Sequence, residues 1–178
     1  MIITQTKAAA DEMGGGVAAD RFLAFSLAEE LFAVEVPRVL QIRSWGNVIP
    51  APDAPDYVLG VAGVQGADSY VVDLRKRLAL RSVPPNSRTL VVVLRFSCNG
   101  VTMPIGFAVD FVSGVHEFDE KVTEPPTDLH SPANREFIRG VTIVDNRQVL
   151  VLETDRLIDQ SVLASWATAR VPDNRRAH

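Results

Sequence analysis

Asp-Tyr-Val-Leu-Gly-Val, residues 56–61, returns 80 residues later as Glu-Phe-Ile-Arg-Gly-Val, residues 136–141. The same offset pairs Asp73 with the acidic Glu153, and no gap interrupts it. A period longer than about 50 residues exceeds that of most solenoid repeats and is typical of duplicated subdomains. We therefore interpret the chain as two copies of one structural unit.

The copies span about residues 21–80 and 88–160, and both show the period-2 alternation of half-buried strands. Each begins with a predicted hairpin and continues through a crossing segment, a proline-containing loop, a second hairpin and a short helix. Turns are predicted at residues 66–69 and at Asn99-Gly100, which is a strong hairpin signal. Four or five short strands per copy indicate a mainly β protein made of two small barrels or sandwiches packed side by side. Gly60 and Gly140 occupy matching positions, where close backbone approach is expected to exclude a Cβ.

Composition fits a soluble globular protein that does not bind nucleic acid through a general basic surface. Apolar residues make up 47% of the 178, enough for a core, and the formal net charge is −4. Cys98 is the only cysteine, which rules out an intrachain disulfide and suits a reducing compartment. With no long apolar run, no membrane insertion is expected, and the predicted location is cytoplasmic.

Both ends of the chain differ in composition from the repeated region. Residues 1–19 are rich in Ala and Gly and are predicted to form a flexible tail without the features of a signal peptide. Thr154 is predicted to cap a last helix, and residues 161–178 are predicted to hold its end and a second flexible tail.

No catalytic constellation stands out in the sequence, so we expect no enzyme, no metal site and no cofactor. The histidines are scattered, and phosphate-binding loops and dinucleotide fingerprints are absent. Asp73 and Asp110 end predicted strands, where acids commonly cap turns. Catalysis would need a cleft that holds both within hydrogen-bonding reach. The basic residues from Arg75 to Arg81 are interpreted as a solvated helix face rather than a binding patch.

Several ordered stretches together resemble the CheW family of bacterial chemosensory adaptors. The resemblance covers about residues 21–160 and rests on FLAFSLAEELFAVEVPRVLQIR, YVLGVAGVQG, YVVDLRKRL, GFAVDFVSGV and EFIRGVTIVDNRQVLVLETDRLI. It implies two packed five-stranded β-barrels of SH3-like topology with short helices. It also implies a non-catalytic scaffold that couples chemoreceptor tips to a CheA-type histidine kinase and is recruited to membrane-associated receptor arrays.

The chain departs from the family pattern in its first copy. Gly63, Val64 and Gln65 stand where the family usually has Asn, Leu and Arg, and Gln41 stands where it has Glu. Tyr70 replaces a usual proline. Because charge-assisted contacts are stronger than neutral ones, these changes predict altered receptor recognition, as in a specialised or non-flagellar pathway.

The resemblance also suggests two binding surfaces. The receptor-binding candidates are Val36, Val39, Gln41, Gly63, Val64 and Gln65. The kinase-binding candidates are Val48, Ile49 and Val58, for which plain core packing is an equal alternative. A β-barrel that binds single-stranded nucleic acid is the alternative function, and it would need a basic groove with stacking aromatic residues.

Overall fold

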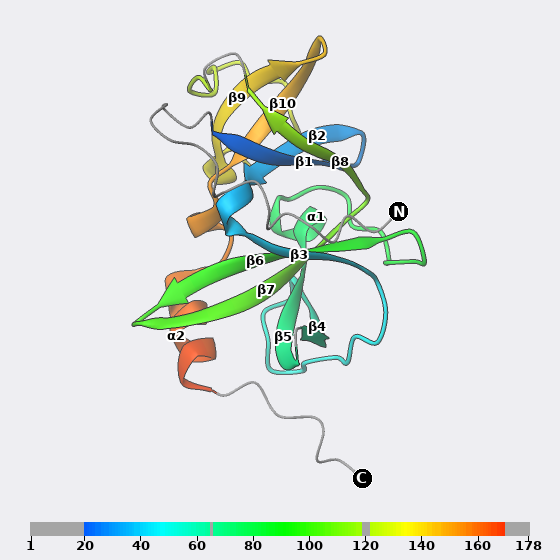
Figure 1. Ribbon diagram of the computed structural model, residues 1–178, viewed down its shortest axis with the longest axis vertical. Coiled ribbons are helices and arrows are strands. Elements are labelled where there is room, and N and C mark those ends of the chain that lie inside the picture. Colours follow the sequence, from blue (N-terminus) through cyan, green and yellow to red (C-terminus); the bar gives the residue numbers. More distant parts are fainter. Residues whose placement is uncertain (1–19, 65, 119–121, 170–178) are drawn as a thin grey trace, which may run out of the picture.

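The computed structural model describes residues 20–64, 66–118 and 122–169, which form two five-stranded sheets joined by short helices (Figure 1). Sheet A contains β1 (Arg21–Leu27), β2 (Glu30–Glu35), β8 (Phe111–Glu117), β9 (Ile138–Val144) and β10 (Arg147–Leu152). Sheet B contains β3 (Val39–Ser44), β4 (Val58–Val64), β5 (Ala67–Asp73), β6 (Leu90–Cys98) and β7 (Val101–Val109). The helical segments are η1 (Val36–Arg38), α1 (Leu74–Arg77), η2 (Arg135–Phe137), η3 (Thr154–Arg156) and α2 (Gln160–Thr168). The predicted fold class is confirmed.

The two sheets exchange their first hairpins between the sequence copies. Sheet A has the order β8-β1-β2-β10-β9 and sheet B the order β3-β6-β7-β5-β4. Each sheet therefore combines the first two strands of one copy with the last three of the other. The prediction that each copy forms its own barrel is therefore wrong. The exchange arises because the connections after β2 and β7 are short. These connections carry the chain directly into the other sheet, and the hairpin left behind pairs in parallel with a strand of the other copy.

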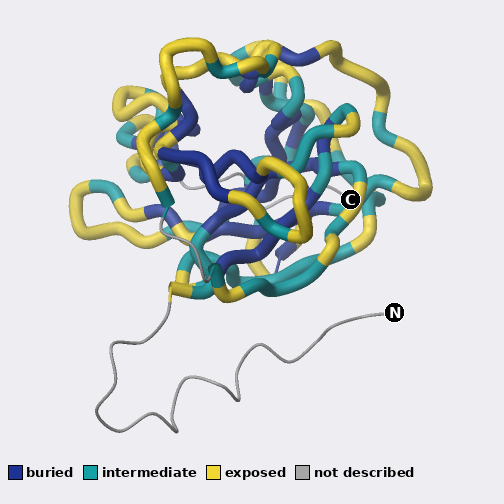
Figure 2. Tube along the Cα trace, turned by 90° about the horizontal axis from the view of Figure 1, so that it is seen from above, coloured by how far each residue is buried: buried dark blue, intermediate teal, exposed yellow. Residues whose placement is uncertain are grey.

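The exchange buries the central strands on both faces. On β1, Leu23 and Phe25 point into a core shared by both sheets, whereas Phe22 points into a smaller cluster inside sheet A. On β6, Val92 joins the shared core and Val93 the cluster inside sheet B. Figure 2 shows the buried backbone concentrated at the centre of the molecule. Each fully buried large side chain contributes about 1.5–3 kcal/mol relative to exposure, so the shared core holds the two sheets together.

The repeated glycines mark the closest backbone approaches of the fold. A Cβ on Gly60 would lie 2.2 Å from the Ile49 carbonyl oxygen, and one on Gly140 would lie 2.7 Å from that of Thr123. In both copies, a loop residue exchanges two backbone hydrogen bonds with the residue that follows the glycine. Gly60 also has a φ of 152°, which side chains disfavour. The predicted exclusion of a Cβ is therefore confirmed at both sites.

Several predicted turns and helices are found, and two need correction. The hairpin at Asn99-Gly100 is present, with φ values of 50° and 76°. The turn predicted at residues 66–69 ends earlier, because β5 already begins at Ala67 and pairs along β4. Thr154 does not cap the last helix. It is buried in η3, and α2 starts only at Gln160, because Leu157 and Ile158 must enter the shared core first. Residues 1–19 and 170–178 lie outside the described ranges.

Both tryptophans pack against the body of the protein. Trp166 of α2 is buried and stacks on Tyr70 of β5, with ring centroids 4.0 Å apart and planes 13° apart. Tyr70 thus gives α2 a flat apolar surface that a proline could not extend as far. Trp45 is partly buried and packs against the cluster inside sheet B. Within the described ranges, no helix has the length and apolarity needed to cross a membrane.

We predict that Gly60→Ala destabilises the protein by about 2 kcal/mol or more, because it combines a backbone clash with an unfavourable φ. For a chain of this size, the melting temperature should fall by roughly 5 °C. Gly140→Ala should destabilise through the clash alone. Gly46→Ala is the control, since nothing lies within 4 Å of the added Cβ. Equal melting temperatures for all three variants would refute the close-approach argument.

Candidate binding site

The edges of sheet B, β3 and β4, face each other across a seam. Leu40 of β3 and Val64 of β4 pack on the same cluster inside sheet B. The Arg43 guanidinium on β3 donates a hydrogen bond through Nη1 to the carbonyl oxygen of Gly63 on β4. We call Leu40, Gln41, Arg43, Gly63 and Val64 the β3–β4 seam. It is a place where two strand edges approach and a side chain, rather than a backbone ladder, links them.

The seam contains three of the predicted receptor-binding residues. Gly63 is exposed, with open space where a side chain would stand. The Oε1 atom of Gln41 is buried and has no hydrogen-bond partner in the described part of the chain. Val64 is 1% exposed and packs inside sheet B, so its side chain can support a binding surface but cannot contact a partner itself.

The remaining receptor-binding candidates lie elsewhere. Val36 and Val39 pack against the shared core, on the side of the sheet opposite the interior cluster that Leu40 contacts. Gln65 falls outside the described residues. Gly63 and Val64 are therefore adjacent on β4, Gln41 lies on β3, and Val36 and Val39 pack against the shared core.

The predicted kinase-binding residues do not share one face. Val48 packs inside sheet B beside Gly60, and Val58 packs against the shared core. Ile49 is 50% exposed, and its backbone pairs with Val61. Ile49 is thus the member of this set that presents substantial apolar area to a partner.

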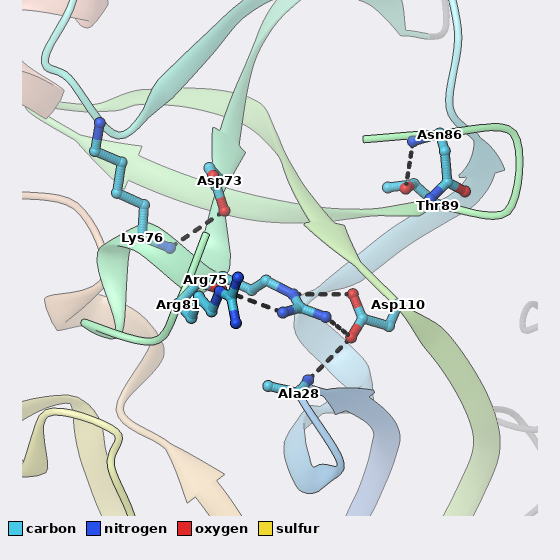
Figure 3. A network of polar contacts seen from close by, with 8 residues as sticks. All are labelled: Ala28, Asp73, Arg75, Lys76, Arg81, Asn86, Thr89 and Asp110. Atoms are coloured by element: carbon cyan, nitrogen blue, oxygen red, sulfur yellow. Dashed lines mark hydrogen bonds and ion pairs between the residues drawn. The ribbon is translucent and has the colours of Figure 1, made fainter. Parts of the chain in front are cut away.

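The two carboxylates considered for catalysis line one cavity of about 250 Å³. Asp73 accepts hydrogen bonds from the Lys76 amide (3.2 Å) and the Ser82 hydroxyl (2.6 Å), which makes it the cap of α1. Asp110 accepts hydrogen bonds from the Ala28 amide (2.9 Å) and the Arg75 guanidinium (Figure 3). Each carboxylate is thus engaged by its own structural partners, and no hydrogen bond joins the two. Among the described residues, no group of three metal-ligating side chains is found.

The Arg75–Asp110 pair links segments from both sheets. Arg75 follows β5 of sheet B, Asp110 lies between β7 and β8, and Ala28 lies in the turn between β1 and β2 of sheet A. The Arg75 side chain is only 17% exposed, so its charge is largely removed from water. The interpretation of Arg75 as part of a solvated face is wrong, because the exchange of hairpins brings an acid from the second copy against it.

A second ion pair repeats this link with the charges reversed. Asp155 stands 80 residues after Arg75, at the matching position, and it accepts a hydrogen bond from Arg38 of η1 at 2.6 Å. Arg38 connects β2 to β3, as Asp110 connects β7 to β8. This second pair is more exposed, at 30% for Arg38 and 62% for Asp155, so it should contribute less to stability.

Arg77 lies where the two copies meet. Its guanidinium carbon is 4.5 Å from the ring centre of Tyr57 and 4.7 Å from that of Phe137, which are matching residues of the repeat. It donates hydrogen bonds to the Leu157 carbonyl oxygen (2.6 Å) and to Asp159 (3.0 Å). Burial raises the pKa of Tyr57, and the charge of Arg77 opposes this shift. Arg77 therefore joins both copies through cation–π contacts rather than facing solvent.

A protein-family model described as the CheW-like domain matches residues 21–162, a range that includes all ten strands. The chain belongs to the CheW family. The expected resemblance is thereby confirmed over both sheets.

Two curated relatives illustrate how far this CheW-family chain has diverged. It is 32% identical to the chemotaxis protein CheW of Rhizobium meliloti (strain 1021), over 75% of this chain and 83% of the relative. It is 24% identical to the chemotaxis protein CheW of Klebsiella aerogenes, over 88% of this chain and 92% of the relative. The crystal structure of the scaffolding protein TtCheW from Thermoanaerobacter tengcongensis has the same fold. The TM-score is 0.68 at 22% identity, and the match covers 80% of this chain and 95% of that one.

Sequence reasoning missed Arg43, Arg75 and Arg77 as organising residues of this CheW-family fold. Arg75 and Arg77 stand in one basic run, and nothing local distinguishes them from solvated residues. The repeat itself offered a signal, because Arg75 matches the oppositely charged Asp155. A charge reversal at matching positions indicates that each residue faces a different partner.

We predict that Asp110→Ala costs about 2 kcal/mol of unfolding free energy, because it leaves a largely buried guanidinium and the Ala28 amide without their acceptor. Asp155→Ala should cost less than about 1 kcal/mol, since the second pair is exposed. Urea denaturation measures both values, and Asp53→Ala, which removes an exposed carboxylate, is the control. Equal costs for Asp110→Ala and Asp155→Ala would contradict the difference in burial.

Proposed function

We propose that this protein is a non-catalytic chemotaxis scaffold that couples chemoreceptors to a CheA-type histidine kinase. The observation that carries this proposal is the extent of the family match, because every strand of the described fold lies inside the matched range. The engagement of Asp73 and Asp110 in structural hydrogen bonds supports a scaffold rather than an enzyme. The proposed setting is the cytoplasmic face of receptor arrays.

The proposed receptor side is the β3–β4 seam, and the proposed kinase side includes Ile49. The seam offers an exposed Gly63 and the guanidinium of Arg43. Ile49 offers exposed apolar area in the loop whose backbone approaches Gly60. Apolar contacts of this kind are common at the centres of protein interfaces.

The neutral residues at Gln41 and Gln65 support a specialised receptor partner. Two opposite charges that are usual in the family are absent together, so the proposed receptor side lacks a pair of charge-assisted contacts. Gln41 is not part of the shared core. We therefore propose altered partner choice rather than loss of the fold.

We expect the full chain to co-sediment with membranes containing a chemoreceptor and a CheA-type kinase encoded in the same genome. Omitting the receptor should abolish sedimentation of the adaptor, while the soluble kinase should still be retained by the tagged adaptor in a pull-down. Ile49→Asp should reduce kinase retention, and Val101→Asp, at an exposed apolar residue on β7, is the matched control. Absence of binding to both partners would refute the proposed function.

We also predict that the double variant Gln41→Glu/Gln65→Arg strengthens binding to receptors recognised by ordinary family members. An added charge-assisted contact of roughly 1 kcal/mol corresponds to about fivefold in affinity. Each single variant should gain less, because it introduces a charge without its opposite. Gln148→Glu, at an exposed position near the start of β10, is the control for added charge. An unchanged dissociation constant for the double variant would count against the assignment of these positions to the receptor side.

A further inference from the structure

The two sheets close their seams in different ways, although they are built from matching strands. In sheet A, Phe118 directly follows β8 and stacks on Phe22 with ring centroids 4.5 Å apart. Phe118 packs on the same interior cluster as Val144 of β9, so apolar contacts close that seam. In sheet B, Leu40 and Val64 also pack on one interior cluster, and the Arg43 guanidinium adds a hydrogen bond to the Gly63 carbonyl oxygen. Both seams are therefore closed by apolar contacts, but only the seam of sheet B is also spanned, within the described residues, by this charged side chain.

The residue that matches Gly63 in the second copy emphasises this difference. Ile143 stands 80 residues later on β9 and is 48% exposed, so it covers the strand edge with a branched side chain. Gly63 has no side chain, and the space above its Cα is open. A partner can therefore approach the backbone of β4 at Gly63 more closely than it can approach β9 at Ile143.

The charge at the β3–β4 seam is not neutralised by an ion pair. Across the described ranges, no carboxylate lies within salt-bridge distance of Arg43, and its hydrogen bond goes to a neutral carbonyl. Asp68 pairs with Gly63 in the backbone register of β4 and β5. Two residues before Arg43 on β3, the buried Oε1 of Gln41 has no hydrogen-bond donor among the described residues. A guanidinium held only by a carbonyl retains most of its five donors for a ligand.

We propose that the β3–β4 seam binds a carboxylate side chain of the chemoreceptor and that Arg43 is the residue that selects it. A guanidinium matches a carboxylate with two parallel hydrogen bonds, which are stronger and more directional than its bond to the Gly63 carbonyl oxygen. The open space at Gly63 lets the acidic residue reach Arg43 from outside. Gln41, two residues away on the same strand, is neutral and adds no carboxylate to this part of β3. This inference rests on the proposed function and adds the chemistry of the receptor segment.

The test compares Arg43→Gln with Arg43→Lys. Glutamine keeps a hydrogen-bond donor for the Gly63 carbonyl oxygen but removes the charge, whereas lysine keeps the charge. The probe is the purified cytoplasmic fragment of a chemoreceptor from the same genome, titrated against the full-length adaptor by calorimetry at low and moderate salt. Arg43→Gln should weaken binding about tenfold at low salt, with a smaller salt dependence than the unmodified chain. Arg43→Lys should retain more affinity than Arg43→Gln.

Two controls separate this inference from the proposed function and from a folding defect. Arg156→Ala removes the same charge from an exposed site on η3 and should leave the affinity within about twofold of the unmodified chain. Binding of the kinase by Arg43→Gln, together with an unchanged melting temperature, shows that the barrel is intact. If Arg43→Gln binds the receptor fragment as tightly as Arg43→Lys, the inference is overturned while the scaffold function stands. If the unmodified chain binds neither the receptor nor the kinase, the proposed function itself fails.

Discussion

The exchange of hairpins between the two sequence copies is the constraint on which the rest of this structure depends. Neither copy can complete a sheet by itself, so each sheet needs strands from both halves of the chain. The central strands become buried on both faces. One face of each strand packs on the cluster inside its own sheet, and the other face packs on the core shared by both sheets. This arrangement removes the weakness of a single small barrel, whose core would contain few residues. It also means that the two sheets should unfold together, since separating them would expose the largest core cluster.

Electrostatic contacts then make the two copies distinguishable. Arg77 binds the matching aromatic residues Tyr57 and Phe137 at the place where the copies meet, and it has no symmetric counterpart there. The pairs Arg75–Asp110 and Arg38–Asp155 connect corresponding segments with opposite polarity. If a segment of one copy took the place of the matching segment of the other copy, residues of like charge would face each other in these two pairs. Such reversed charges disfavour the incorrect pairing of similar strands, a hazard of any duplicated β protein.

The sequence predicted the elements of the fold better than their pairing. Alternating residues gave the strands, the Asn99-Gly100 dipeptide gave one turn, and the repeated glycines gave both close approaches. The exchange could not be read from these patterns, because a strand shows the same alternation whichever neighbour it pairs with. A partial signal was present in Val91-Val92-Val93-Leu94, whose continuous apolar character indicates burial on both faces. For the binding site, the sequence named Gln41 and Gly63, but only the fold brings the Arg43 guanidinium to the Gly63 carbonyl oxygen.

The asymmetry between the two seams follows from the same duplication. A repeat supplies two equivalent places at which strand edges meet, and only one of them needs to remain available for a partner. Phe118 and the branched Ile143 cover the edges in sheet A, whereas Arg43 and the bare Gly63 leave those in sheet B polar and accessible. An open edge carries a risk of unwanted strand pairing, and a charged side chain laid across it reduces that risk. The Arg43 guanidinium can thus protect the edge in the free protein and recognise an acidic partner in the complex, because both roles require the same charge at the same position.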